Sequence, residues 1–192
     1  MKKNKKKLIT SLVILIILSI GIGYAYLTSN LSITGATEIA ANTWDIHFAN
    51  LVVNSDSVEA TTPAAINPSD NTSITYTVKL NRPKDFYEFT VDVVNGGTIN
   101  AKIADNGVTN TSLTQTQDTY VNYTVTYADG TEISAGDKLA KAGTTVNSVA
   151  QNVKTVKVRV EYDPTITPAQ LNAMGENYIT LDLTFAMTYV QD

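Results

Sequence analysis

The sequence predicts an all-β fold: an antiparallel, jelly-roll-like β-sandwich with one short helix, preceded by an N-terminal hydrophobic helix. Three observations support this prediction. Apolar and polar residues alternate with period two in several segments beyond residue 43. These segments are rich in Val, Ile, Thr and Tyr, which suit a pleated, half-buried surface. Glycine-containing turn signals separate several of them. Because each segment has one apolar and one polar face, we expect antiparallel rather than buried parallel strands.

The N-terminal segment predicts export. Five lysines lie within the first seven residues, before an uncharged run of 20 residues, Leu8–Leu27. A helix of that length spans about 30 Å, the thickness of the bilayer's hydrocarbon core. The lysines hold its start in the cytoplasm. The run is either a retained anchor or a signal peptide cut after Ala25, with Gly23 and Ala25 at the −3 and −1 positions. Gly21 and Gly23 loosen the helix end, which favours cleavage.

Two segments follow from this reading. Residues 1–25 form the signal peptide or membrane anchor, and residues 26–192 form a single β-sandwich ectodomain. The 167 exported residues suffice for one domain with its own core. We expect an extracellular or cell-surface protein, which the membrane holds through residues 8–27 if the leader is not cleaved.

Charge and cysteine content exclude several classes of function. Five of the 14 basic residues lie in the leader and all 18 acidic residues lie beyond it, which leaves the ectodomain near −9. Such a surface repels nucleic acid, so we expect no nucleic-acid partner. The chain has no cysteine, which excludes cysteine nucleophiles and thiolate metal sites. This pattern is typical of bacterial surface proteins.

The expected strands follow one another along the chain, each defined by its apolar face. These faces consist of Trp44, Ile46 and Phe48; Ile74, Tyr76, Val78 and Leu80; Tyr87, Phe89, Val91 and Val93; Ile99, Ala101 and Ile103; Val121, Tyr123, Val125 and Tyr127; Val156, Val158, Val160 and Tyr162; and Ile179, Leu181, Leu183, Phe185, Met187 and Tyr189. Seven or more short strands with this spacing indicate a sandwich or jelly roll.

Turn signals separate some of these strands. Ala128–Thr131 contains Asp-Gly, the sequence that supplies the positive φ angles of a tight hairpin. Asn95–Gly97 and Asp105–Gly107 punctuate the chain in the same way. The stretches 54–72 and 104–118 are rich in Asn, Ser, Thr and Asp, and we expect surface loops there.

One segment predicts a helix. Ile166–Gly175 has Thr167 as a capping residue, Pro168 at the first helical position and Gly175 at the end. We expect about two turns.

The sequence favours no catalytic function. His47 is the only histidine, so the usual histidine-rich zinc site cannot form, and no serine triad is marked. His47 lies beside Asp45 on a polar strand face, where a solvated side chain is expected. No phosphate-binding glycine motif occurs. We therefore predict that the chain is not an enzyme and has no catalytic, cofactor-binding or metal-binding residues.

Two groups of residues leave alternatives open. Four aspartates in or near turns could hold calcium through several oxygens, although turn chemistry alone explains Asp in such places: Asp118, Asp129, Asp137 and Asp163. Four tyrosines could form an aromatic platform for sugars or a self-association face, although strand alternation already requires large apolar residues there: Tyr76, Tyr123, Tyr127 and Tyr162. In both cases we favour the structural explanation.

Several features together resemble the TasA/camelysin family of exported bacterial surface and biofilm-fibre proteins. The lysine-rich leader ends in small and aromatic residues, Gly21–Tyr26, and a short polar strand, Leu27–Gly35, follows it. A segment shaped like Pro-Gly-Asp is present as Pro83-Lys84-Asp85, in which Lys84 replaces the family's glycine. A Phe-x-Val strand (Phe89–Val91) and an Asn-x-Gly turn (Asn95–Gly97) come after it.

The resemblance implies a jelly-roll fold, a leader suited to an ER-type signal peptidase, and fibre subunits that donate their N-terminal strand to a neighbour's sheet. In the strand Leu27–Gly35 of this chain, apolar and polar residues partly alternate, as such pairing requires. We therefore expect a non-catalytic extracellular structural protein that self-associates through this strand. The alternatives are a membrane-tethered binding module for sugar or protein and a metal-dependent hydrolase.

Overall fold

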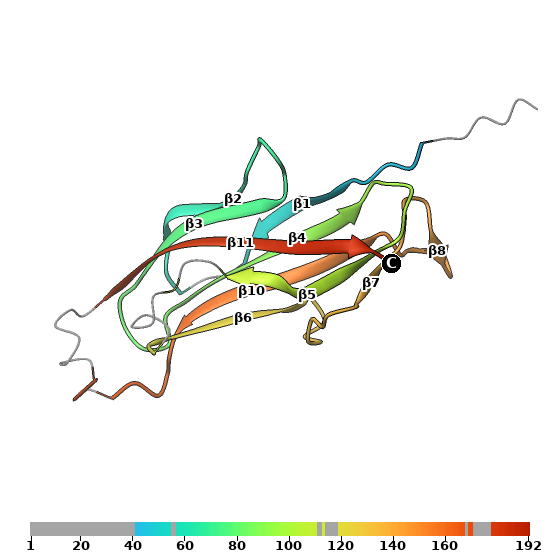
Figure 1. The fold of residues 1–192 in the computed structure, drawn as a ribbon. Coiled ribbons are helices and arrows are strands. Elements are labelled where there is room, and N and C mark those ends of the chain that lie inside the picture. The colour runs from blue at the N-terminus through green and yellow to red at the C-terminus, as the bar shows by residue number, and fades with distance from the viewer. Residues whose placement is uncertain (1–40, 55–56, 111–112, 114–118, 168, 171–177) are drawn as a thin grey trace, which may run out of the picture. The chain divides into compact units, whose positions relative to one another are not determined.

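The structure, a computed structural model, describes residues 41–54, 57–110, 113, 119–167, 169–170 and 178–192. The described chain is all-β and antiparallel, as the sequence predicts (Figure 1). The predicted N-terminal helix and the segment boundary at residue 25 lie outside these residues. Within the part of the chain that is described, no helix is long and apolar enough to cross a membrane.

The strands form two main sheets and a small hairpin. The four-stranded sheet has the order β1-β4-β10-β6 and consists of β1 (Ile46–Val53), β4 (Phe86–Asn95), β10 (Val153–Tyr162) and β6 (Val121–Tyr127). The five-stranded sheet has the order β2-β3-β11-β5-β7 and consists of β2 (Ala60–Ile66), β3 (Ser73–Leu80), β11 (Ile179–Gln191), β5 (Ala101–Asn110) and β7 (Lys138–Leu139). The hairpin consists of β8 (Thr145–Val146) and β9 (Val149–Ala150).

Both sheets contribute their apolar faces to one hydrophobic core. Strict alternation produces this burial: every second residue of β4, from Tyr87 to Asn95, is buried, and its neighbours are half-buried. Phe48 of β1 stacks on Phe185 of β11 with ring centroids 5.4 Å apart, which joins the two sheets. The arrangement is therefore sandwich-like.

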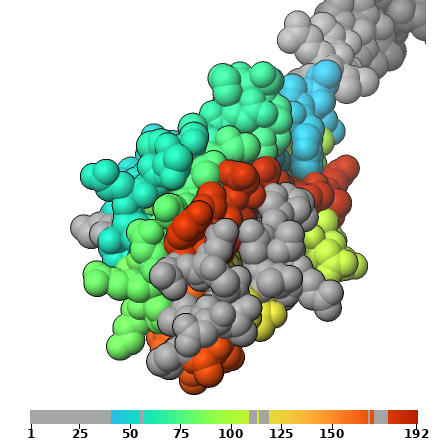
Figure 2. All heavy atoms as spheres, turned by 90° about the vertical axis from the view of Figure 1, so that its left-hand side faces the viewer, coloured from blue at the N-terminus to red at the C-terminus, as the bar shows by residue number. Residues whose placement is uncertain are grey.

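The sandwich has two distinguishable ends. At one end lie Asn95, the start of β10 and the C-terminus. At the other lie Phe86, the end of β10 and the start of β2. Figure 2 looks at this second end, with the segment around β2 in teal. Because β4 runs from one end to the other, its ten residues span about 34 Å.

Several sequence predictions need correction. Strand β2 lies inside the stretch 54–72, which was expected to be a loop, and β5 continues through residues 104–110 of the second expected loop. Asp105–Gly107 is not a turn between strands but part of a bulge in β5. The register moves there from Ile103 opposite Tyr189 to Val108 opposite Met187. A bulge and a turn can both require positive φ, and Asn106 has φ 60°.

Other predictions are confirmed. The turn at Ala128–Thr131 is tight: Gly130 has φ 87°, and its N–H donates to the carbonyl of Tyr127 (2.9 Å). At the predicted helix cap, Thr167 and Gln170 form a reciprocal pair, since the Gln170 N–H donates to Thr167 Oγ1 and the Thr167 N–H donates to Gln170 Oε1. This is a capping box. The remainder of the predicted helix, residues 168 and 171–175, lies outside the described residues.

Candidate functional site

The first described residues of the chain are fixed against the turn after β4. The Gly96 N–H donates to the carbonyl of Asp45 (2.8 Å), and the Thr98 N–H donates to the carbonyl of Thr43 (3.0 Å). The close approach requires glycine: a Cβ at Gly97 would lie 2.5 Å from the carbonyl oxygen of Thr43. This turn therefore holds Thr43 and Asp45 beside the end of β4.

Asn95 holds that turn together from inside the core. Its side chain is buried, donates to the carbonyl of Ile99 (2.9 Å) and accepts from the Gly97 N–H (2.9 Å). The Asn152 side chain donates to the Asn95 carbonyl (3.2 Å). The Asn-Gly-Gly signal in the sequence is thus an Asn-capped turn that anchors the start of β1.

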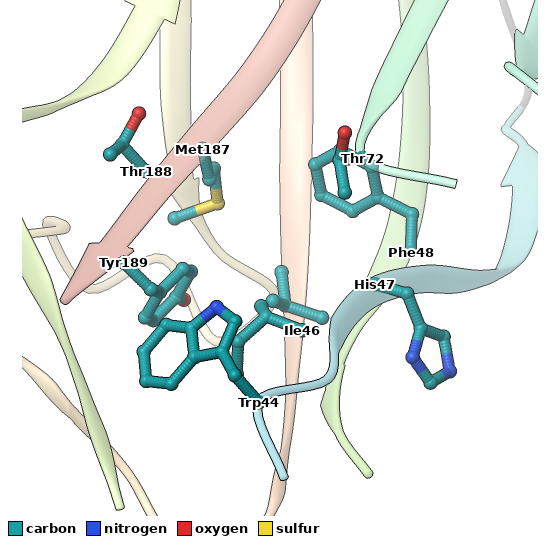
Figure 3. A pocket seen from close by; sticks show the side chains of 9 residues that line it. Trp44, Ile46, His47, Phe48, Thr72, Met187, Thr188 and Tyr189 are labelled. Carbon is teal, nitrogen blue, oxygen red and sulfur yellow. The ribbon is translucent and has the colours of Figure 1, made fainter. Parts of the chain in front are cut away.

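A pocket opens beside this anchored segment, between the start of β1 and the end of β11. Its volume is about 220 Å³, and its lining is mainly apolar and aromatic: Trp44, Ile46, His47, Phe48, Thr72, Val93, Met187, Thr188 and Tyr189. In Figure 3 the rings of Trp44 and Tyr189 lie together at one side of the pocket, and His47 points away from it. Trp44 is 47% exposed. We call this pocket the aromatic cleft.

The strand that borders the aromatic cleft is open along one edge. The pairing of β11 with β3 ends at Ala186, opposite Ser73, and Met187–Gln191 pairs with β5 alone among the described strands. The Asp192 N–H donates to Asn100 on the β5 side (3.1 Å). Because successive residues direct their backbone groups to opposite sides, the N–H and C=O of Gln191 and Tyr189 face away from β5. We call Met187–Gln191 the open edge.

The Tyr189 hydroxyl in the cleft stays protonated near neutral pH. Burial raises the pKa of Tyr189 above its ordinary value, and the negative charge of Asp137 adds to the rise. His47 Nδ1 lies 2.8 Å from Asp45 Oδ1 on the outer face of β1. Within the described ranges, no group of three His, Cys, Asp or Glu side chains could hold a metal ion. The arrangement is suited to binding backbone and apolar side chains.

The aspartates considered for calcium are placed separately and take part in local turns. Asp129 accepts from the Thr131 N–H and Oγ1, and Asp163 accepts from the same two groups of Thr165. These bonds hold the pKa of each carboxyl below its usual range. Asp137 accepts from the Tyr127 hydroxyl and the Ser134 N–H. Asp118 lies outside the described residues.

The tyrosines considered for an aromatic platform belong to the core or its edge. Tyr76 and Tyr162 are buried, and Tyr123 and Tyr127 pack against the core. Within the described chain, the hydroxyls of Tyr76 and Tyr123 have no hydrogen-bond partner. Burial raises the pKa of Tyr123 to about 12. The structure therefore confirms that these four residues lie in the core or at its edge, although the hydroxyls of Tyr76 and Tyr123 are buried and do not reach water as expected.

The sequence does not predict the aromatic cleft, although its apolar and aromatic lining residues lie on predicted apolar strand faces. Trp44, Met187 and Tyr189 all continue an alternating pattern, and nothing local distinguishes them from core residues. The feature that could have indicated the cleft is the difference in length between two paired strands: β11 has 13 residues, whereas its partner β3 has eight.

Comparisons of the chain with protein-family models, with curated proteins and with solved structures give no match.

Proposed function

We propose that this chain is an exported, non-catalytic structural subunit of a bacterial surface or biofilm matrix. Copies would associate when the N-terminal strand of one, Leu27–Gly35, pairs with the open edge of another. The observation that supports the proposal is the open edge itself: backbone groups of β11 that pair with no other described strand lie directly beside an apolar pocket. Main-chain pairing supplies affinity in such strand addition, and pockets for alternate side chains supply specificity.

The sequence of the N-terminal strand fits that geometry. Leu27, Leu31 and Ile33 lie two or four residues apart, so an extended strand directs them to one face. Apolar side chains on that face suit the aromatic cleft. Assembly of this kind also accords with the resemblance to the TasA/camelysin family, and the jelly-roll assignment belongs to the same proposal.

Cleavage of the leader decides whether this strand is available. A cut after Ala25 would free Tyr26 as the new N-terminus, whereas a retained helix would leave Leu27–Gly35 as a tether between membrane and domain. The first experiment is therefore the mass of the N-terminal peptide of the protein from its own cells. Tyr26 at the N-terminus is expected, and an intact leader would contradict the proposal.

A variant of the open edge tests the pairing directly. Gln191→Pro removes an N–H that faces away from β5, and proline is tolerated on an unpaired strand edge. We expect salt-tolerant fibres from the natural chain, no fibres from Gln191→Pro, and the same melting temperature for both. Gln191→Ala is the matched control and should assemble normally. Equal assembly of the proline and alanine variants would refute pairing at this edge.

A second candidate function is a membrane-tethered binding module for sugar or protein. The exposed Trp44 ring beside Tyr189 favours it, since aromatic rings at a pocket suit the apolar faces of sugars. This function predicts a retained leader and a ligand-dependent rise in melting temperature. Trp44→Ala should abolish that rise.

A metal-dependent hydrolase is the third alternative considered from the sequence. It requires a stoichiometric bound metal in the purified protein, which elemental analysis measures.

A further inference from the structure

An exposed apolar hairpin lies at the Asn95 end of the sandwich. Strands β8 and β9 pair with each other and join neither main sheet, with Val146 directly opposite Val149. Their side chains are 55% and 61% exposed. The tip residues Asn147 and Ser148 both have positive φ, 49° and 65°, which closes a tight two-residue turn. In Figure 1 the hairpin lies beyond the ends of the sheets. We call it the valine hairpin.

An apolar hollow lies at the opposite end of the sandwich. It has a volume of about 550 Å³ and is lined by Val53, Ser57, Val58, Glu59, Ala60, Pro63 and Tyr87. Val52 and Val53 beside it are 56% and 40% exposed. The Tyr87 hydroxyl accepts a hydrogen bond from the Ala64 N–H (3.0 Å), which fixes the ring that forms one wall. Figure 2 faces this end. We call it the end hollow.

Complementary charges accompany the two surfaces. Lys141 lies in the segment that leads to the valine hairpin and is exposed, and Glu59 is exposed in the lining of the end hollow. Within the described residues, neither side chain forms an ion pair. A contact between the two ends would bring a cation to an anion.

We propose that the valine hairpin of one copy of this chain seats in the end hollow of the next, so that copies associate head to tail. The proposal rests on the proposed function, in which the chain is a self-associating subunit. The two surfaces are different and lie at opposite ends of one domain, so the contact is heterologous. A heterologous contact that does not close into a ring generates an open filament.

A second copy fits better than an unrelated partner. Each copy carries both an apolar projection and an apolar hollow, with an unpaired charge of opposite sign beside each. Each surface is small, and a repeating assembly would cover both of them in every copy.

End-to-end contact is also compatible with strand donation. Residues 27–40 number 14 and extend at most about 50 Å, whereas the ten residues of β4 span about 34 Å. A segment leaving one copy at the Asn95 end could therefore run the full length of the copy that abuts it and reach that copy's open edge. The valine hairpin would fix the order of the subunits, and the donated strand would join them.

The absence of cysteine from the chain permits a direct test. In the full chain, Ser148→Cys places a thiol at the hairpin tip, and Pro63→Cys places one in the lining of the end hollow while leaving Glu59 unchanged. The two lie at opposite ends of the domain, beyond the reach of an intramolecular disulfide. Mild oxidation of the assembled double variant should give a ladder of covalent multimers on a non-reducing gel. Each single variant, as the matched control, should stop at dimers. No ladder from an assembled double variant would overturn the proposal.

Charge reversal supplies an independent measurement. Lys141→Glu and Glu59→Lys should each raise the protein concentration needed for assembly, measured by sedimentation, about tenfold, which corresponds to roughly 1.4 kcal/mol. The variant with both reversals should restore the concentration that the natural chain needs. Lys157→Glu, in the middle of β10, is the matched control and should assemble as the natural chain does. Full assembly of both single reversals would contradict the proposal.

The outcomes separate this inference from the proposed function. If the natural chain assembles while the cysteine ladder and the charge effects are absent, head-to-tail seating is wrong and strand donation stands. If the natural chain with its mature N-terminus stays monomeric, both are wrong.

Discussion

The two buried polar residues of the described chain lie at opposite ends of β4 and make different hydrogen bonds: Asp85 directly precedes the strand, and Asn95 is its last residue. The Asp85 carboxylate accepts from the backbone N–H groups of Asn81 and Arg82, within its own turn. The Asn95 amide bonds to Ile99 and reaches Leu139, 44 residues away. An acceptor-only carboxylate suits a local turn, whereas an amide, which both donates and accepts, can join distant segments.

This difference predicts that the Asn95 end is the more vulnerable one. Asn95→Ala should leave the carbonyl of Ile99 and the N–H of Gly97 buried without partners, at a cost of about 3 kcal/mol. Urea unfolding measures this loss in the free energy of unfolding. Asn95→Asp keeps the acceptor for Gly97 and should be intermediate at high pH. If Asn95→Ala lowered the free energy of unfolding by less than Asp85→Ala does, the Asp85 end would be the more vulnerable one.

The Asp85 end should lose less when its carboxylate is removed. Asp85→Ala frees two N–H groups close to solvent, and we expect a loss of about 2 kcal/mol. The ion pair with Arg82 contributes little, because the Arg82 side chain is 83% exposed and the Nε–Oδ1 distance is 3.4 Å. Arg82→Ala is therefore the matched control and should leave the unfolding midpoint nearly unchanged. An equal loss in both variants would assign the effect to the ion pair.

Substituting the glycines at the Asn95 end tests whether the backbone contact with Thr43 stabilises the domain as much as the side-chain amide of Asn95 does. Gly97→Ala places a Cβ against the carbonyl of Thr43 and should cost about 1–2 kcal/mol. Amide hydrogen exchange at Thr98 should accelerate, because its bond to Thr43 weakens. Gly96→Ala meets the Asp45 side chain, which can move, and should cost less. A larger loss of stability in Gly96→Ala than in Gly97→Ala would show that residues 43–45 are not held at this turn.

A stabilising change is available at the Asp85 end. Lys84 has φ 77°, in the left-handed region that costs a residue with a Cβ about 1–2 kcal/mol. Lys84→Gly removes that cost but adds freedom to the unfolded chain, so the net gain should be about 0.5–1 kcal/mol. Lys84→Ala removes the lysine charge but keeps a Cβ, so it separates the backbone effect from the charge effect and should show no gain in stability. Calorimetry at equal pH measures the stability of both variants.

The smallest effect at neutral pH concerns the tyrosine pair near the Asp85 end. Tyr76 stacks on Tyr87, and burial raises the pKa of Tyr76 far above its ordinary value, with the neighbouring Tyr123 adding to the rise. Tyr76→Phe should be slightly stabilising at pH 7, because it removes a buried hydroxyl that has no hydrogen-bond partner within the described residues. The stability linked to Tyr76 is present below pH 10 and is lost as pH rises above it, where the unfolded tyrosine ionises. The variant should therefore gain on the natural chain by about 1.4 kcal/mol per pH unit above 10. If the free energies of unfolding of the natural chain and of Tyr76→Phe changed in parallel above pH 10, this prediction would be wrong.

The alternation in the sequence was sufficient to predict β4 and its partners, because their buried faces repeat every second residue. It was insufficient for β2, an edge strand whose pairing with β3 shifts register twice and whose Pro63 is exposed. Strand β2 buries only Ala64, so its sequence carries little periodic signal.

The aromatic cleft could not be predicted for a different reason. It exists because β11 continues past the point where β3 ends, and that depends on which strands pair. The Asn95–Gly97 signal was recognised as a turn, but its role in holding Thr43 involves residues 55 positions apart. Lys84 illustrates the converse: the sequence shows that Lys84 stands where the TasA/camelysin motif that the chain resembles has glycine, and its φ of 77° is one that glycine adopts more readily.

The attachment of Thr43 beside the end of β4 has a mechanical consequence. In a filament under tension, force would enter the domain at this residue and pass along the axis of β1. Strand β1 pairs antiparallel with β4 along most of its length. A force that pulls Thr43 along the strand axis, while the rest of the domain is held, therefore loads the hydrogen bonds between β1 and β4 together, in shear. Bonds loaded in shear must break nearly at once, whereas bonds that are peeled break singly. If the chain assembles as proposed, the turn that holds Thr43 would thus help the described domain to resist stretching.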